Sequence, residues 1–280
     1  MADFLTYRFK DSPEFMNIFD EAPLWSARFG FLLLDNIELK PEMVVLDIGS
    51  GAGFPLIELA ERLSNTSKVY GIDPWKNANE RAKQKIEYFG LSNVEIIEQP
   101  AEHLPFDDNT FDLITGNLGI NNFENRDHVI KECYRILKPE GRIAITTNTV
   151  GHWKEFYGVF EQTLVELERE DLIQKLRAEQ EHRGTIETLS IWFKDNGLVP
   201  IKLIEDAFNM YFVDGTAFLN HHFVKCGWLE SWFNLCPEEC RTEIFKVLEQ
   251  NLNTYASQYN GLKLIVPMAY IEVKKLYDNV

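Results

Sequence analysis

The chain is short of cysteine, of positive charge and of long apolar runs. Its 280 residues include four cysteines, and 28 lysines and arginines stand against 44 aspartates and glutamates, for a net charge of −16. Such a charge repels phosphate backbones and anionic lipid surfaces, so we expect neither nucleic acid nor membrane as a partner. No stretch approaches the roughly 20 apolar residues of a spanning helix. Arg8, Lys10 and Asp11 interrupt the amino-terminal segment, which therefore does not resemble a signal peptide, and we expect a cytoplasmic protein.

Few cysteines and no export signal are typical of reduced thiols rather than of a disulfide framework. The four are Cys133, Cys226, Cys236 and Cys240. On a helix Cys236 and Cys240 would lie one turn apart, which leaves a metal site as an alternative. Zinc sites usually show two tight ligand pairs, whereas this is one loose pair, so we expect no metal.

What the chain does have is one stretch, residues 44–63, that reads VVLDIGSGAGFPLIELAERL. An apolar run ends in Asp47, glycine follows at every second position (Gly49, Gly51 and Gly53), and apolar residues at helical spacing come last. This order predicts a strand, a tight turn and a helix. Alternating glycines let a ligand approach the main chain, and the free N–H groups of the helix start face the same space. We therefore predict a small polar ligand at this loop.

The glycine spacing distinguishes between ligands. The dinucleotide fingerprint G-x-G-x-x-G fails, because Phe54 and Leu56 stand where its third glycine would be. The pattern D-x-G-x-G-x-G fits, and it resembles motif I of the class I S-adenosylmethionine-dependent methyltransferases. Further segments resemble the same family in the family's order, and together they extend from residue 44 to about residue 147: VYGIDPW (69–75), EQPAEHLPF (98–106), FDLITGNLGI (111–120) and ECYRILKPEGRIAITT (132–147).

The resemblance implies S-adenosylmethionine as the cofactor and S-adenosylhomocysteine as its product. In the family, the acid at the end of the second strand, here Asp73, holds the ribose hydroxyls. Many members carry Asp where this chain has Pro100, so the polar contact to adenine has to come from the backbone or from a neighbour such as Glu102. The residues that the resemblance assigns to the cofactor are Asp47, Gly49, Ser50, Gly51, Asp73, Pro74, Trp75, Ala101, Glu102, Asn117 and Leu118.

Predicted strands and helices alternate along the chain, which is typical of a parallel sheet covered on both faces. With the resemblance, this predicts an α/β fold: a Rossmann-like, doubly wound, seven-stranded, mostly parallel sheet with an antiparallel last strand. The expected strands lie at about 43–48, 69–73, 94–98, 111–116, 142–147, 200–212 and 263–273. The expected helices lie at about 13–19, 24–36, 55–64, 77–89, 126–137 and 185–198.

We expect a single methyltransferase domain over residues 1–280. Its core would comprise residues 41–150, 184–212 and 260–280. Residues 1–40 would form an amino-terminal helical cap, and residues 151–183 and 213–259 would be helical insertions, because a simple connection needs far fewer residues. Cap and insertions together would form a helical lid over the cofactor pocket and would select the acceptor.

The implied reaction is the in-line SN2 transfer of a methyl group to a small-molecule acceptor. Orientation in a dry site can drive it without a metal, and a base is needed only if the acceptor is protonated. His152, His221 and His222 are the candidate bases, with surface or core histidines as the alternative. The candidate acceptor contacts, for which packing or loop formation is the alternative, are Tyr7, Trp25, Asn121, Asn122 and Tyr211.

Two other functions stay open at this point. One is a protein that binds the cofactor without transferring a methyl group, since binding and transfer use different residues. The other is an NAD-dependent oxidoreductase, against which Phe54 and Leu56 argue. The sequence selects neither the acceptor nor an oligomeric state.

Overall fold

The computed structural model describes residues 4–20, 24–181 and 183–276. The chain divides into two compact units, each built from three segments. The sheet unit comprises Asp11–Asn148, Thr185–Glu205 and Met268–Val280, and the helical unit comprises Met1–Lys10, Thr149–Gly184 and Asp206–Pro267.

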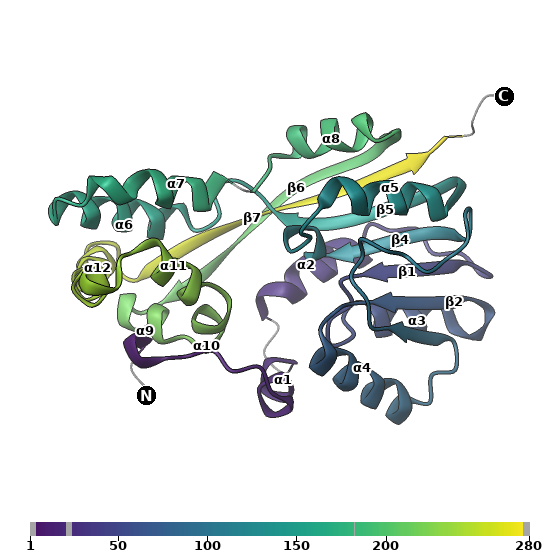
Figure 1. The fold of residues 1–280 in the computed structure, drawn as a ribbon, viewed down its shortest axis with the longest axis horizontal. Helices are drawn as coiled ribbons and strands as arrows, with labels where there is room; N and C mark the ends of the chain where they lie inside the picture. The colour runs from purple at the N-terminus through teal and green to yellow at the C-terminus, as the bar shows by residue number, and fades with distance from the viewer. Residues whose placement is uncertain (1–3, 21–23, 182, 277–280) are drawn as a thin grey trace. The chain divides into compact units, whose positions relative to one another are not determined.

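Figure 1 shows the helices and strands of both units and labels most of them. The strands are β1 (Val44–Ile48), β2 (Lys68–Ile72), β3 (Val94–Ile97), β4 (Phe111–Asn117), β5 (Leu137–Asn148), β6 (Leu198–Phe212) and β7 (Leu262–Lys275). The helices of the sheet unit are α1 (Pro13–Asp20), α2 (Leu24–Leu34), α3 (Leu56–Leu63), α4 (Lys76–Phe89), α5 (Arg126–Ile136) and α8 (Ile186–Asp195). Those of the helical unit are α6 (Lys154–Glu166), α7 (Ile173–Glu181), α9 (Gly215–Asn220), α10 (His222–Val224), α11 (Glu230–Leu235) and α12 (Glu238–Tyr259).

The strands form one seven-stranded sheet in the order β3-β2-β1-β4-β5-β7-β6. β1 pairs in parallel with β2 on one side and with β4 on the other. β2 in turn pairs in parallel with β3, and β4 pairs in parallel with β5. β7 runs antiparallel to β5, with Ile145 opposite Ile271. The predicted α/β fold with its antiparallel last strand is confirmed. β5 begins earlier than expected, because Leu137 already pairs with Phe111 before a shift in register.

Two apolar cores cover the two faces of the sheet, because side chains alternate along each strand. On β1, Leu46 and Ile48 belong to the core that includes α5 and α8, whereas Val45 belongs to the core that includes α2 and α3. The helices therefore lie on both sides of a parallel sheet, and the carboxyl ends of the strands are left for the loops that bind ligands.

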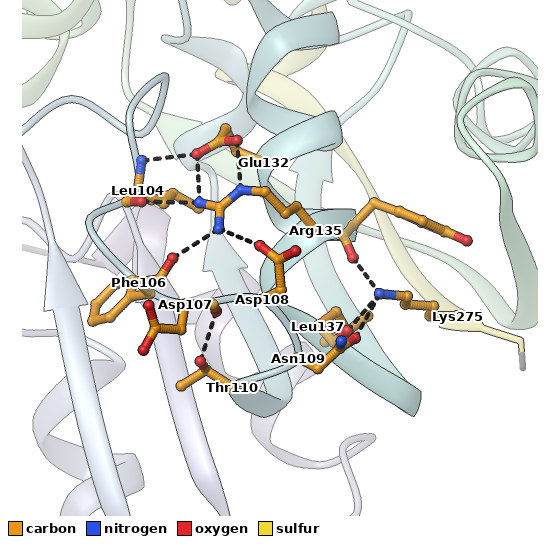
Figure 2. Close-up of polar contacts among 11 residues, drawn as sticks. Leu104, Phe106, Asp107, Asp108, Asn109, Thr110, Glu132, Arg135, Leu137 and Lys275 are labelled. Atoms are coloured by element: carbon orange, nitrogen blue, oxygen red, sulfur yellow. Dashed lines mark hydrogen bonds and ion pairs between the residues drawn. The ribbon is translucent and has the colours of Figure 1, made fainter. Parts of the chain in front are cut away.

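Arg135 on α5 fixes the segment that leads from residue 104 into β4 (Figure 2). Its guanidinium donates to the carbonyl oxygens of Leu104, at 3.1 Å, and Phe106, at 2.7 Å. It also pairs with Asp108 and with Glu132, each at 2.8 Å. Planar bidentate geometry of this kind is specific to arginine. The contact anchors the chain directly after residues 100–103, which line the site described below.

Lys275, near the end of β7, lies at the other side of this cluster (Figure 2). The side chain is buried, and its Nζ donates to the carbonyl oxygens of Tyr134 and Leu137, at 2.9 and 2.8 Å, and to Asn109 Oδ1 at 3.0 Å. Because methionine cannot donate, Lys275→Met is expected to lower the free energy of unfolding by about 2 kcal/mol. Urea denaturation measures the change.

The adjacent lysine provides the matched control. Lys274 pairs with Glu140 in a partly exposed ion pair, and such pairs contribute about 0 to 1 kcal/mol. We expect Lys274→Met to have a small effect on the same curve. Equal losses in the two variants would show that the buried hydrogen bonds of Lys275 do not stabilise the sheet unit.

The helical unit has an aromatic core of its own. Phe156 of α6 packs on Trp232 with their ring centres 4.3 Å apart, and Phe160 packs on Phe245 of α12 at 5.6 Å. Between α10 and α11, Lys225–Leu229 form a turn of π-helix. In the described part of the chain, no helix has both the length and the apolar character that crossing a membrane requires.

Candidate cofactor site

A cavity of about 650 Å³ lies at the carboxyl ends of β1, β2 and β4 in the sheet unit. This is the edge at which open α/β sheets bind their ligands. The residues that line the cavity are Gly49, Ile72, Asp73, Pro74, Trp75, Pro100, Ala101, Glu102, His103, Asn117, Leu118, Gly119, Asn122, Phe123 and Glu124.

Most residues that the sequence assigned to the cofactor come together around this cavity: Gly49, Asp73, Pro74, Trp75, Ala101, Glu102, Asn117 and Leu118. Asp47, Ser50 and Gly51 do not line it. Ser50 is fully buried. Asp47 lies on β1, and Ser50 and Gly51 follow Gly49 in the loop after it.

Asp73 lies directly after β2 and has two main-chain donors. Its Oδ2 accepts the N–H of Gly51 at 3.0 Å, and its Oδ1 accepts the N–H of Trp75 at 2.8 Å. Burial raises the pKa of Asp73, and these two bonds oppose the rise. A carboxylate has about four acceptor positions, so about two are left for a ligand. Asp73 can therefore accept both hydroxyls of a vicinal diol.

Gly49 and Gly51 shape the loop in different ways. Both have positive φ, 73° and 49° respectively. A Cβ on Gly49 would lie 3.0 Å from the Cα of Gly119, which also lines the cavity, whereas a Cβ on Gly51 would meet nothing within 4 Å. The loop at Gly49 is thus packed against the main chain of the segment after β4, and only glycine fits there.

A pair of glycine variants separates the cost of the positive φ from the cost of the close contact with Gly119. Gly51→Ala is expected to cost about 1 kcal/mol of unfolding free energy, from the left-handed backbone alone. Gly49→Ala adds the contact with Gly119 and is expected to cost about 2 kcal/mol or more. Urea denaturation of both variants measures the difference. Equal costs would contradict the close packing at Gly49.

Asp47, near the end of β1, is fully buried. Thr115 Oγ1 donates to its Oδ1 at 2.8 Å, and Oδ2 has no hydrogen-bond partner of normal geometry among the described residues. Burial is the main cause that raises the pKa of Asp47 to about 7; the Thr115 bond opposes it, and the charge of Asp73 adds to it. Asp47 is therefore part of the buried strand that precedes the glycine loop, and it does not face the cavity.

Leu118 holds a backbone conformation that leucine seldom adopts, with φ of 69°. Its N–H donates to the carbonyl oxygen of Thr146 at 2.9 Å, which fixes the segment after β4 to β5. Next to it, Thr146 Oγ1 donates to Asn117 Oδ1 at 2.8 Å. Non-glycine residues in this region cluster at functional sites, and Leu118 lines the cavity.

The wall at Trp75 is backed by α1. The rings of Phe15 and Phe19 each lie 6.3 Å from that of Trp75, centre to centre. Asp20 at the end of α1 accepts from Arg81 at 2.9 Å and from Lys85 at 2.8 Å on α4. These contacts hold the amino-terminal helix beside the cavity wall.

Glu102 is already engaged by the chain. Its Oε1 accepts the N–H groups of Glu124 and Asn125, at 3.1 and 3.3 Å. These bonds bring the loop before α5 to the cavity and so add Phe123 and Glu124 to its wall. Sequence reasoning missed these two residues, because no motif or periodicity marks them. It also missed His103, although this residue lies within the segment 98–106 that resembles the family.

The predicted acceptor residues are dispersed. Asn122 lines the cavity, whereas the amide of Asn121 is bonded to Asn148 at 2.7 Å and to Thr147 at 2.8 Å. Trp25 is buried against Phe29, with the ring centres 4.7 Å apart. The remaining candidates lie in the helical unit: Tyr7, Tyr211, His152, His221 and His222.

Within the helical unit, His152 is buried beside Trp153 and Trp228, at ring distances of 4.4 and 5.8 Å. Partial burial lowers the pKa of both His221 and His222. Tyr211 lies beside a separate cavity of about 740 Å³ in this unit. Over the described residues, no group of three or more His, Cys, Asp or Glu side chains could hold a metal ion, and Cys240 instead accepts from Arg169 at 2.7 Å.

Comparison with known proteins agrees with this geometry. A family model described as a methyltransferase domain matches residues 39–205, more than half of the 280-residue chain. The demethylmenaquinone methyltransferase of Bacillus cereus (strain ATCC 10987 / NRS 248) is 38% identical over 107 residues, which are 38% of this chain and 45% of that protein. The matched part therefore spans about half the length of the curated relatives.

Solved structures share the fold. A putative methyltransferase from Bacillus halodurans aligns with 91% of this chain and 100% of its own, at 21% identity and a TM-score of 0.57. A SAM dependent methyltransferase from Aquifex aeolicus aligns with 70% of this chain and 93% of its own, at 22% identity and a TM-score of 0.53. Because the family model matches more than half of the chain, on a sheet of this order, the chain belongs to the class I S-adenosylmethionine-dependent methyltransferases, whose cofactor is S-adenosylmethionine.

Proposed function

We propose that the sheet-unit cavity binds S-adenosylmethionine and that the chain transfers its methyl group to a small-molecule acceptor. The observation that carries the proposal is Asp73, a cavity-lining carboxylate with two main-chain donors and about two acceptor positions left for a diol. The ribose of the cofactor has such a diol. No other carboxylate in the described cavity wall follows a strand of the sheet directly.

The remaining wall suits the other parts of the cofactor. Gly49 and Leu118, both with positive φ, would present main chain to the methionine end, and Pro74, Trp75 and Ala101 would flank the adenine. Glu102, together with the loop before α5 to which it is hydrogen-bonded, would lie beside the adenine. When bound, the sulfonium supplies an electrophilic methyl carbon. The chain contributes position and exclusion of water, and orientation alone can supply about 7 to 11 kcal/mol.

The acceptor is proposed to be selected by the helical unit, which contains the predicted insertions, the three candidate bases and two of the five predicted acceptor contacts. Relatives named demethylmenaquinone methyltransferases make a quinol one acceptor to test. They match 38% of this chain, so amines, phenols and carboxylates belong in the same panel.

Calorimetric titration with S-adenosylmethionine, S-adenosylhomocysteine and NAD tests the cofactor. We expect both sulfur ligands to bind and NAD to give no binding signal. Binding of NAD alone would overturn the proposal. Formation of S-adenosylhomocysteine with the acceptor panel then tests transfer. Binding without turnover on any acceptor would instead favour a catalytically silent cofactor-binding protein, because the residues that hold the cofactor do not by themselves perform transfer.

A further inference from the structure

Two cysteines lie close together in the helical unit, where α11 ends and α12 begins. Cys236 is the residue that follows α11, and Cys240 lies in the first turn of α12, which starts after Pro237. Both are free thiols; Cys236 is buried, whereas Cys240 is partly exposed. The pair therefore combines one thiol that solvent reaches with a second thiol buried behind it.

The sulfur of Cys240 has a cation within hydrogen-bond distance. Arg169 Nη1 donates to Cys240 Sγ at 2.7 Å. The same guanidinium is oriented by Asp171, to which its Nε and Nη2 donate at 2.8 and 2.9 Å. A cation in this position stabilises the ionised form of a thiol, and the start of a long helix acts in the same direction. The ionised form is the one that reacts with oxidants and other electrophiles.

Cys236 is suited to react second. Burial, followed by the charge of Cys240, raises the pKa of Cys236 to about 11, and the charges of Arg241 and Arg169 oppose the rise. The charge of one thiol acts on the other because the two side chains are neighbours. Arg241 Nη2 also donates to the carbonyl oxygen of Cys236 at 3.2 Å. Cys236 stays protonated near neutral pH, which leaves Cys240 as the thiol that an oxidant meets first.

The other two cysteines have different surroundings. Among the described residues, neither of them accepts a hydrogen bond from an arginine. Cys226 is partly exposed, as Cys240 is, but its Sγ donates to the carbonyl oxygen of His222 at 2.7 Å, and burial raises its pKa. Cys133 is buried in the sheet unit, and burial together with the charge of Glu132 raises its pKa to about 12. Cys226 is therefore the matched comparison for Cys240.

We propose that Cys240 is an oxidation site for peroxides and that Cys236 closes a disulfide with it. The ionised sulfur of Cys240 attacks one oxygen of hydrogen peroxide, so that an S–O bond forms and the O–O bond breaks. The hydroxide that leaves takes up a proton, equal to the one that Cys240 released, and becomes water.

In the second step the sulfur of Cys236 attacks the sulfur of the sulfenic acid at Cys240. An S–S bond forms, the S–O bond breaks, and the thiol proton of Cys236 leaves with the second water. Two thiols thus lose two electrons, and one peroxide is reduced to two waters. The disulfide would join the end of α11 to the first turn of α12 and would release Arg169 from the sulfur.

Labelling of the full chain with iodoacetamide near neutral pH, followed by mass spectrometry of its peptides, tests the reactivity of Cys240. We expect Cys240 to be labelled at least about tenfold faster than Cys226. Arg169→Gln should slow the labelling of Cys240 several-fold and leave Cys226 unchanged, and Arg169→Lys should restore part of the rate. The buried Cys133 reports on folding, because it is labelled quickly only in an unfolded chain. Equal rates at Cys240 and Cys226, or no effect of Arg169→Gln, would overturn the proposal.

Treatment with hydrogen peroxide tests the disulfide. Glu238 and Glu239 lie between the two cysteines, so cleavage after glutamate gives peptides that stay joined only through a disulfide. We expect joined peptides from the wild type and from Cys226→Ser, separated again by dithiothreitol. Cys236→Ser should stop at a sulfenic acid on Cys240, which dimedone traps, and Cys240→Ser should leave Cys236 reduced.

The proposal also fails if peroxide yields no joined peptides, or if it oxidises Cys236 in Cys240→Ser as readily as in the wild type. Neither experiment uses methyl transfer. A failure of the proposed function would therefore leave both results standing, and a failure here would leave the cofactor assignment untouched.

Discussion

Replacing Asp73 with alanine is expected to weaken the binding of S-adenosylmethionine by about a hundredfold or more. The variant removes the carboxylate that we propose as the acceptor of both ribose hydroxyls, and hydrogen bonds to a charged group contribute about 1.5 to 3 kcal/mol each. It also releases the N–H groups of Gly51 and Trp75, which Asp73 holds at 3.0 and 2.8 Å, so the glycine loop loses its link to the end of β2. Calorimetric titration at one pH measures the change.

Asp112 provides the matched control for this variant. Like Asp73, it accepts a main-chain N–H, that of Val44 at 2.8 Å, but it lies near the start of β4 and does not line the cavity. We expect Asp112→Ala to reduce stability and to keep the affinity for the cofactor. If both variants lost affinity to the same extent, the loss would come from a weakened fold, and the role of Asp73 in the site would be contradicted.

Asp47 should make the stability of the unliganded protein depend on pH. Its pKa is about 7 in the folded state and 3.8 as the reference value, so the folded state holds the proton more tightly. The resulting stabilisation is complete below about pH 4, falls as the pH rises, and is lost above about pH 7. A shift of this size corresponds to up to about 4 kcal/mol of unfolding free energy. Asp47→Asn cannot titrate and should lack this loss.

Urea denaturation of the wild type and of Asp47→Asn at a series of pH values measures the difference between them. We expect the free energy of unfolding of Asp47→Asn to rise relative to that of the wild type as the pH increases from 4 to 7. Thr115→Val removes the bond that opposes the rise in pKa, so the loss of stability should still begin near pH 4 and should extend to a higher pH than in the wild type. A constant difference between wild type and Asp47→Asn across the series would show that folding does not raise the pKa of Asp47.

The parts of the site that were predicted from sequence are those fixed by neighbouring residues. The alternating glycines from Gly49 onward determine a turn within a few residues, and the acids Asp47 and Asp73 mark the ends of two apolar runs. Parallel strands bring their carboxyl ends to one edge, so local patterns were sufficient to place these residues around one loop.

The parts that were not predicted depend on contacts between distant residues. The left-handed backbone of Leu118 is held by a bond to Thr146 on the next strand, and nothing in the sequence around Leu118 signals it. The loop with Phe123 is positioned by the carboxylate of Glu102. The packing of Phe15 on Trp75 likewise joins two segments that no motif connects.

The position of β7 between β5 and β6 has a consequence for how the protein is made. β7 follows both strands in the chain, and the bond between Arg142 and Glu272 joins residues 130 positions apart. While the ribosome synthesises residues 213–261, β7 does not yet exist. One edge of β5 and the whole of β6 therefore lack the strand with which they pair in the finished sheet. Unpaired strand edges favour aggregation, and pairing across such separations is slow. The nascent chain is thus most exposed to chaperones and to misassembly in the interval before β7 emerges.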